Sequence, residues 1–177
     1  GLVLEIAKVH FGSWAYPEPA YTKLAGVPLY SGFMYSSIGS YIAQAFRRFD
    51  LRIASLPSPW LTIPLATTIY LNFFTNHFPP DIRWGLIPAV FVIYGRTRVE
   101  FLCREQRYKM PLAMSFLAIG FFVWLAENIC TGLQGYRYPD QMTGWTLVHG
   151  SKIGSWFLLV ILAFIAVEAV SHKANRT

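Results

Sequence analysis

Charged residues are scarce in this chain, and their scarcity excludes an ordinary soluble domain. Only 14% of its 177 residues are charged and 54% are hydrophobic, whereas soluble proteins carry roughly 25% charged residues. Several apolar runs approach the ~20 residues that span a bilayer. No charged leader opens the chain, so no signal peptide is visible. The composition predicts an integral membrane protein.

Cysteine is scarce as well, with only Cys103 and Cys130 in the chain. Cys103 lies in a basic connector and Cys130 near the far end of an apolar segment, so the two are expected on opposite faces of the membrane. A disulfide bond between them is therefore not expected.

The positive charge of the chain, +6 in net, is concentrated in segments between hydrophobic runs. That distribution argues against nucleic acid as a partner. By the positive-inside rule these segments face the cytoplasm, and the aromatic loops at 12–26 and 132–146 face the other side. The ten Lys and Arg residues that define this orientation are Arg47, Arg48, Arg52, Arg96, Arg98, Arg104, Arg107, Lys109, Lys173 and Arg176.

Glycine and proline divide the chain into six apolar segments. They predict an all-α fold, a polytopic transmembrane helical bundle that forms a single domain over residues 1–177. The chain opens on an apolar run that looks like the middle of a helix, so the first helix is predicted to be truncated and upstream helices to be missing. The predicted helices end near residue 11 and cover 27–46, 59–74, 82–94, 111–131 and 147–170.

A sequence pattern near the start of the chain recurs further along it. Glu5 precedes an aromatic turn that a proline ends, and the same order recurs 122 positions later from Glu127. We interpret this as a parallel internal repeat with halves at about 1–50 and 111–172, because an even number of crossings separates the two acids. The matching turn residues are Trp14, Tyr16, Pro17 and Glu18 in the first copy and Tyr136, Tyr138, Pro139 and Asp140 in the second.

Glu127, Glu5 and Lys152 are the predicted catalytic residues, because a charge inside an apolar helix usually faces a partner or a cavity. Two interpretations of Glu127 and Lys152 stay open: an acid or base tuned by the lysine, and a structural ion pair between two helices. Glu5 and Lys8 share one helical face and form either a local pair or part of the site. Neither a cofactor nor a metal is predicted, because no H-x-x-x-H spacing occurs.

Aromatic and polar residues at a similar predicted depth are assigned to substrate binding. The aromatic residues fit either anchors at the membrane interface or a lid over a lipid-like substrate. Arg137 fits a contact with a headgroup or phosphate, or a pair with Asp140. The predicted set is Trp14, Tyr16, Asn72, Asn128, Tyr136, Arg137, Tyr138 and His149.

Several blocks carry a resemblance to a known family: Gly12-Ser13-Trp14, Tyr16-Pro17-Glu18, Gly26-Val27-Pro28-Leu29, Arg47-Arg48-Phe49-Asp50, Trp124-Leu125-Ala126-Glu127-Asn128, Tyr138-Pro139-Asp140-Gln141 and Ser151-Lys152. Across essentially the whole chain they resemble the YoaT-like family of bacterial membrane proteins, a domain of unknown function. The resemblance implies a polytopic inner-membrane protein and no activity. A weaker, local likeness concerns membrane carotenoid cyclases and hydratases, but Tyr30 and Ser31 stand where the cyclases have acids.

The leading functional hypothesis is an integral membrane protein that binds or transforms a hydrophobic, lipid-like or polyisoprenoid-like molecule in a polar pocket of the outer leaflet. Whether it is an enzyme stays open. The alternatives are a small transporter or permease and a structural accessory subunit of a larger membrane complex. The expected partners are membrane lipids, with other membrane subunits or a second copy as further candidates, and the expected location is the bacterial inner membrane, crossed several times.

Overall fold

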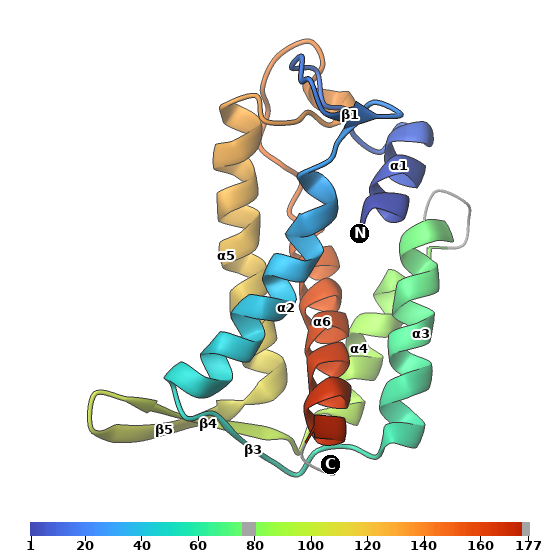
Figure 1. Ribbon diagram of the computed structural model, residues 1–177. Coiled ribbons are helices and arrows are strands. Elements are labelled where there is room, and N and C mark those ends of the chain that lie inside the picture. Colours follow the sequence, from blue (N-terminus) through green and yellow to red (C-terminus); the bar gives the residue numbers. More distant parts are fainter. Residues whose placement is uncertain (76–80, 175–177) are drawn as a thin grey trace.

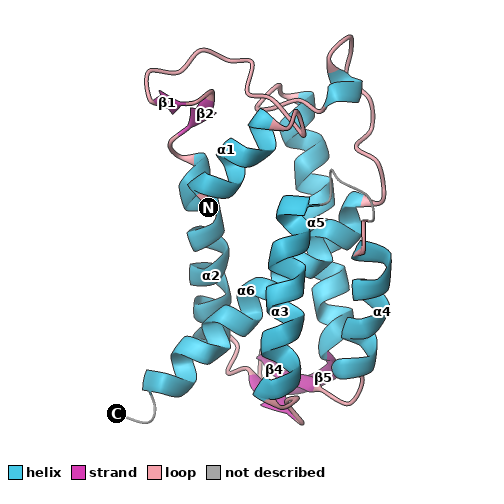
Figure 2. Cartoon of the chain, turned by 90° about the vertical axis from the view of Figure 1, so that its right-hand side faces the viewer, coloured by secondary structure: helices cyan, strands magenta, loops and turns pink. Residues whose placement is uncertain are grey.

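Six α-helices form the body of the molecule in the part of the chain described by the computed structural model, residues 1–75 and 81–174. Five of them run side by side over much of their length, and a short first helix lies beside one end (Figures 1 and 2). A 3-10 helix, η1 (Pro139–Gln141), lies in the loop before the last helix. The α-helices are α1 (Leu2–His10), α2 (Ser31–Arg48), α3 (Pro59–Thr75), α4 (Arg83–Ile93), α5 (Leu112–Gly132) and α6 (Lys152–Ala174).

Two small antiparallel sheets lie at opposite ends of the helices (Figure 2). The first pairs β1 (Lys23–Leu24) with β2 (Val27–Pro28). Its two-residue turn, Ala25–Gly26, has positive φ at both positions, which is the requirement of a type I′ hairpin turn and explains the glycine. The second sheet has the order β3 (Arg52–Ala54), β4 (Arg98–Cys103), β5 (Gln106–Pro111). Its β4–β5 hairpin extends beyond the helices (Figure 1).

The prediction of an all-α polytopic bundle was wrong. The basic connector between 95 and 110, predicted to be a loop, forms β4 and most of β5, and the loop at 12–26 contains β1. A parallel repeat does not describe the fold either. The half at 1–50 joins a nine-residue helix to α2 through a small sheet, whereas the half at 111–172 joins helices of 21 and 23 residues through a loop with a 3-10 helix. In the described residues, two helices are long and apolar enough to cross a membrane, over Leu112–Gly132 and Lys152–Ala169.

The core is built around α6. Phe157, Leu158 and Ile161 on this helix are fully or almost fully buried and lie in one apolar cluster with residues of α3, α4 and α5. α5 approaches α6 closely because Gly120 has no side chain: a Cβ placed there would lie 3.0 Å from the backbone nitrogen of Phe157. Small residues allow such close helix packing.

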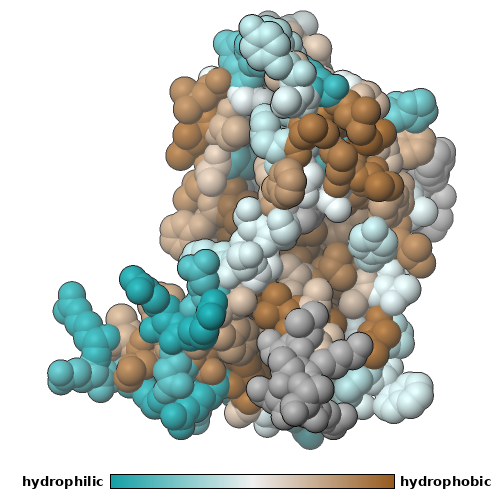
Figure 3. Space-filling view, in the orientation of Figure 1, coloured by the Kyte–Doolittle hydropathy of each residue, from teal (hydrophilic) through white to brown (hydrophobic). Residues whose placement is uncertain are grey.

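Large apolar side chains also cover much of the outside of the helices. Val92 of α4 and Phe122 and Ile129 of α5 are each at least 65% exposed. In Figure 3 hydrophobic residues cover much of the middle of the visible face, and hydrophilic residues gather over the hairpin end and the opposite end. A soluble monomer rarely exposes apolar surface on this scale, so the outside of the helices is suited to contact with lipid or protein.

Candidate carboxylate and aromatic site

Glu127 is buried in α5 with only 4% of its surface exposed, and three neutral donors converge on its carboxyl group. The hydroxyls of Tyr136 and Tyr138 donate to Oε1 at 2.9 and 2.5 Å. The indole Nε1 of Trp156 donates to Oε2 at 2.9 Å. Both oxygens of the Glu127 carboxyl group therefore accept hydrogen bonds, and all three donors come from aromatic side chains.

Glu5 is held in the same way near the N-terminal end of the chain. It is 2% exposed, and its Oε2 accepts hydrogen bonds from Trp14 Nε1 at 3.1 Å and from the hydroxyl of Tyr16 at 2.8 Å. In both cases, an acid inside a helix is bonded by aromatic donors from the loop that follows that helix. The spacing seen in the sequence therefore corresponds to a real local contact pattern at each acid.

The two aromatic loops are bonded directly to each other. Ala15 and Arg137 form an isolated antiparallel bridge, in which each backbone nitrogen donates to the other residue's carbonyl oxygen at 2.9 and 3.0 Å. These two residues are 122 positions apart, the same interval that separates the two acids. The aromatic rings cross-pair around the bridge, with centroids 6.4 Å apart for Trp14 and Tyr138 and 6.2 Å apart for Tyr16 and Tyr136.

Lys152 at the start of α6 lies against the aromatic rings. Its Nζ is 4.0 Å from the ring centroid of Tyr138 and 6.0 Å from that of Trp14, distances typical of cation–π contacts. In the described part of the chain, no ion pair joins Lys152 to Glu127. The lysine is instead linked to each acid through an aromatic ring that bonds that acid.

The tyrosines of the site remain protonated donors at ordinary pH. Burial raises the pKa of Tyr16, and the charge and hydrogen bonding of Glu5 raise it further. The pKa of Tyr138 is raised by burial and then by Glu127, and that of Tyr136 by burial, Tyr138 and Glu127. A phenol that keeps its proton is a fixed donor, so both acids are held by permanent hydrogen bonds.

Arg137 lies beside a separate hollow rather than between the acids. A cavity of about 200 Å³ lies between the end of α5 and the loop after it. The guanidinium of Arg137 donates to Gln134 Oε1 at 2.9 Å, not to Asp140 as one interpretation of the sequence had it. The cavity is lined by Thr131, Gly132, Gln134, Arg137, Gln141, Thr143, Gly144 and Trp145.

The remaining predicted binding residues have structural contacts away from the acids. Asn128 donates to the carbonyl of Trp124 at 2.8 Å and accepts from the backbone nitrogen of Val148 at 2.9 Å, which fastens the returning loop to α5. His149 is exposed, and its Nδ1 lies 2.8 Å from Ser151 Oγ.

Asn72 belongs to a different polar network, between α3 and α4. Its side chain is buried and lies 3.5 Å from Asp81 Oδ1. Asp81 in turn forms an ion pair with Arg83, which donates to Ser155 of α6 at 2.7 Å. The sequence prediction thus joined residues that the structure places in separate groups.

Trp156 was missed by the sequence analysis, whereas Trp145 was interpreted with the other aromatic residues as an interface anchor or part of a lid. Trp156 follows Lys152 by four residues, so the two lie on one face of α6, and this spacing was a signal that the indole faces the same site. Trp145 donates to Thr131 Oγ1 at 3.2 Å across the cavity wall. No local pattern indicates that contact.

Lys8 gives the protein a pH dependence that can be measured. It is 3% exposed, and burial, with the positive charges of Lys152 and Arg83, lowers its pKa to about 8 despite the opposing charge of Asp81. Between pH 8 and 10.5 Lys8 then keeps its proton in the unfolded chain but not in the folded one, so its contribution to stability rises with pH. We expect this contribution to the free energy of unfolding to increase by at most about 1.4 kcal/mol per pH unit, whereas the buried tyrosines, whose pKa values are raised, act in the opposite direction near pH 10.

Chemical denaturation of the detergent-solubilised native chain and of Lys8→Met at pH 7.5, 8.5, 9.5 and 10.5 measures this contribution as the difference between the two proteins. Lys8→Met removes the titrating group while keeping an unbranched side chain, so the difference in the free energy of unfolding is expected to move in favour of the native chain as the pH rises. A difference that does not change with pH would contradict a lowered pKa at Lys8.

Comparison with known proteins gives the chain a family but no activity. It is 52% identical over 177 residues to "Uncharacterized protein YoaT" of Bacillus subtilis (strain 168), a match that covers 100% of this chain and 67% of that protein. No solved structure is significantly similar to this chain. The family resemblance inferred from the sequence is confirmed: residues 1–164 match the family described as "Protein of unknown function (DUF817)", and the chain belongs to that family.

Proposed function

We propose that this chain is anchored in the bacterial inner membrane by α5 and α6 and binds an anionic lipid-like molecule by its headgroup, in the cavity at the end of α5. The observation that carries the proposal is the position of that cavity. It lies against Thr131 and Gly132, the last two residues of a helix long and apolar enough to cross a membrane. A lipid headgroup in the adjoining leaflet would reach the same level.

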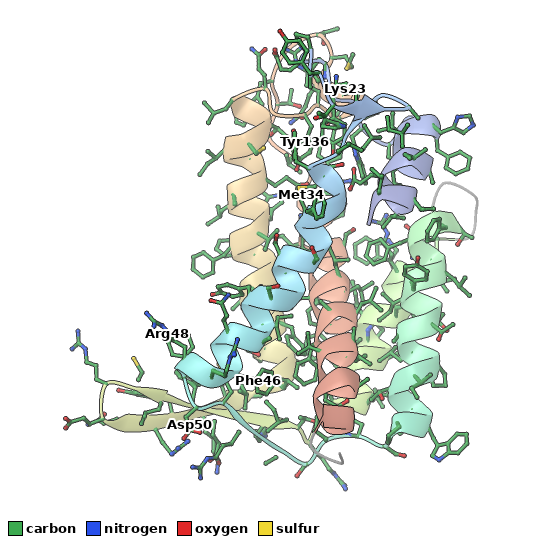
Figure 4. All side chains as sticks on the ribbon, in the orientation of Figure 1. Lys23, Met34, Phe46, Arg48, Asp50 and Tyr136 are labelled. Carbon is green, nitrogen blue, oxygen red and sulfur yellow. The ribbon has the colours of Figure 1, made fainter. Side chains whose placement is uncertain are left out.

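The sidedness in this proposal follows from the distribution of charge. Eight Lys or Arg residues and three acids lie in segments 47–54 and 96–111, at the end of the molecule marked by Arg48 and Asp50 in Figure 4. Tyr136 and the cavity loop lie at the opposite end. The positive-inside rule then puts the basic end in the cytoplasm and the cavity on the other side.

The lining of the cavity favours an anionic group. Arg137 has a planar guanidinium with five N–H donors, which matches phosphate and carboxylate oxygens. One of these donors forms a hydrogen bond to Gln134. Trp145 adds an indole of the kind that lies at membrane interfaces. Ligand pockets commonly combine such a large apolar side chain with a few polar groups.

In this proposal Glu5 and Glu127 hold the wall of the binding site and do not exchange protons with the ligand. Three donors already occupy the carboxyl oxygens of Glu127, and the loop they fasten carries Arg137. Binding is therefore better supported than chemical transformation. The transporter and accessory-subunit alternatives stay predictions.

Native mass spectrometry of the detergent-solubilised chain tests the binding directly. With phosphatidylglycerol as the probe, we expect the native chain to retain one lipid and Arg137→Ala to retain it at least tenfold more weakly. Arg137→Lys should show an intermediate loss, because lysine offers a point charge without the bidentate fork. Glycerol phosphate, which has the headgroup chemistry without acyl chains, separates a lipid site from a site for a free phosphate compound.

Arg96→Ala is the matched control, because it removes the same charge from an exposed position at the other end of the molecule. It should leave retention unchanged within about twofold. Equal losses in Arg137→Ala and Arg96→Ala, or equal retention of phosphatidylcholine by all variants, would contradict a headgroup site at Arg137.

A further inference from the structure

The overhanging part of the β4–β5 hairpin has two chemically different faces. Val99 and Met110 are paired across the hairpin and belong to the apolar core or pack against it. Side chains two residues apart along a strand share a face, so Phe101 and Tyr108, the next such pair outward, lie on the same side. Their rings stack, with centroids 5.7 Å apart. This face therefore extends the apolar surface of the core outward.

Positive charge surrounds this apolar face. Arg104 lies in the tight turn, Arg107 and Lys109 lie on β5, and Arg47 and Arg48 end α2 beside the sheet. Three acids offset eight basic residues in these segments, and two of the three, Asp50 and Glu100, are already paired with basic residues. Figure 3 shows this lower-left part of the molecule as hydrophilic around isolated hydrophobic patches.

The hairpin is also placed at a defined level relative to α5. Strand β5 ends at Pro111, and the apolar helix begins at Leu112. If α5 crosses the bilayer, the boundary between β5 and α5 lies at the edge of the hydrocarbon, and β5 lies at the level of the headgroups. An aromatic pair on one face and basic residues around it are the composition of an element that lies in the interface of an anionic membrane.

We propose that the overhanging β4–β5 hairpin lies in the membrane interface, with Phe101 and Tyr108 turned toward the acyl chains and its basic residues bound to anionic lipid headgroups. The occupant of this surface is the bilayer itself, as the charge complementarity and the continuity with α5 indicate. The inference rests on the proposed membrane anchoring through α5 and is independent of the Arg137 cavity.

Cys103 provides a native probe on the relevant face, because it lies two residues beyond Phe101 and is exposed. In a Cys130→Ala background, Cys103 is labelled with the dye NBD, and the full chain is reconstituted in phosphatidylcholine nanodiscs with or without phosphatidylglycerol. A fraction of the lipid carries a doxyl quencher near the headgroup. We expect at least a twofold loss of NBD fluorescence in discs with phosphatidylglycerol, and a smaller loss without it.

Two variants separate the apolar contact from the fold. Phe101→Ser with Tyr108→Ser removes the stacked pair and should reduce the quenching at least twofold. Leu102→Ser is the matched control, because Leu102 is also partly exposed but lies on the other face of β4, and it should keep the quenching. Circular dichroism of each labelled protein verifies that the helices are intact.

Salt distinguishes the charge contribution. Raising the ionic strength toward 1 M shortens the screening length to about 3 Å, so the extra quenching due to phosphatidylglycerol should disappear while the part due to the aromatic pair remains. The proposal is overturned if NBD at Cys103 is as weakly quenched as free dye in both lipids, or if the double serine variant and the Leu102 control behave alike. Neither result would alter lipid retention at Arg137.

Discussion

Replacing Glu127 by alanine is expected to lower the free energy of unfolding by about 4 kcal/mol. The substitution leaves three buried or partly buried donors, from Tyr136, Tyr138 and Trp156, without their acceptor. Each unsatisfied buried donor costs ~1–3 kcal/mol, and the costs are not fully additive. Chemical denaturation in detergent, followed by tryptophan fluorescence, measures the change.

Glu127→Gln should not restore the native stability. The amide offers one oxygen, which can serve the two phenols on the Oε1 side, but its NH₂ group then faces the indole N–H of Trp156. Two donors in contact repel each other, because an indole nitrogen cannot accept. The third donor is therefore the reason to expect a partial loss of stability.

Trp156→Phe combined with Glu127→Gln removes that conflict and gives the sharper test. We expect the double variant to be more stable than the sum of the single changes by about 1–2 kcal/mol, the size of a direct coupling. Glu100→Ala is a control, since its exposed pair with Lys109 should contribute less than about 1 kcal/mol. Additive effects of the two changes would show that Trp156 does not bond Glu127.

Most of the helices could be predicted because long apolar runs identify them without knowledge of the fold. The predicted segments at 59–74, 82–94 and 111–131 differ from α3, α4 and α5 by a residue at most ends. Apolar run length specifies helices better than strands. The start of the last helix was predicted at 147 but lies at Lys152, because Val148 is bonded to Asn128, a contact twenty residues away.

The strands were missed for a physical reason. β4 and β5 alternate polar and apolar residues, as in Arg98-Val99-Glu100-Phe101, which is a strand pattern, but their many charges favoured a solvated connector. β3 is three residues long, and it exists only because β4 offers it a partner. A strand that short has no local signal.

Only the contacts between residues close together in the chain could be predicted for the site. The interval from each acid to its tyrosines could be taken from the sequence, and the structure bonds those residues. What the sequence could not give is how the two loops meet, since the bridge between Ala15 and Arg137 joins positions far apart in the chain. One of the two interpretations of the sequence paired Lys152 with Glu127 by charge, but the Tyr138 ring lies against its ammonium instead.

Gly120→Val is expected to be the other strongly destabilising change, by about 3 kcal/mol, because the close approach of α5 and α6 depends on the missing side chain. A Cβ at Gly120 would lie 3.0 Å from the backbone nitrogen of Phe157 and 3.1 Å from the carbonyl oxygen of Ile153. Both are main-chain atoms of α6, so a rotamer change cannot relieve the contact. Overpacking of this kind costs ~1–3 kcal/mol or more, and a β-branched side chain adds bulk in the same direction.

Gly120→Ala should cost less than Gly120→Val, because alanine is favoured over glycine in a helix by about 1 kcal/mol and offsets part of the strain. Gly85→Ala in α4 measures the gain in helix propensity alone, since no atom lies within 4 Å of a Cβ at that position. It is expected to stabilise the protein slightly in the same denaturation assay. If Gly120→Val and Gly85→Ala shift the unfolding midpoint alike, α5 and α6 do not approach each other at Gly120, and the two apolar helices must pack in another register.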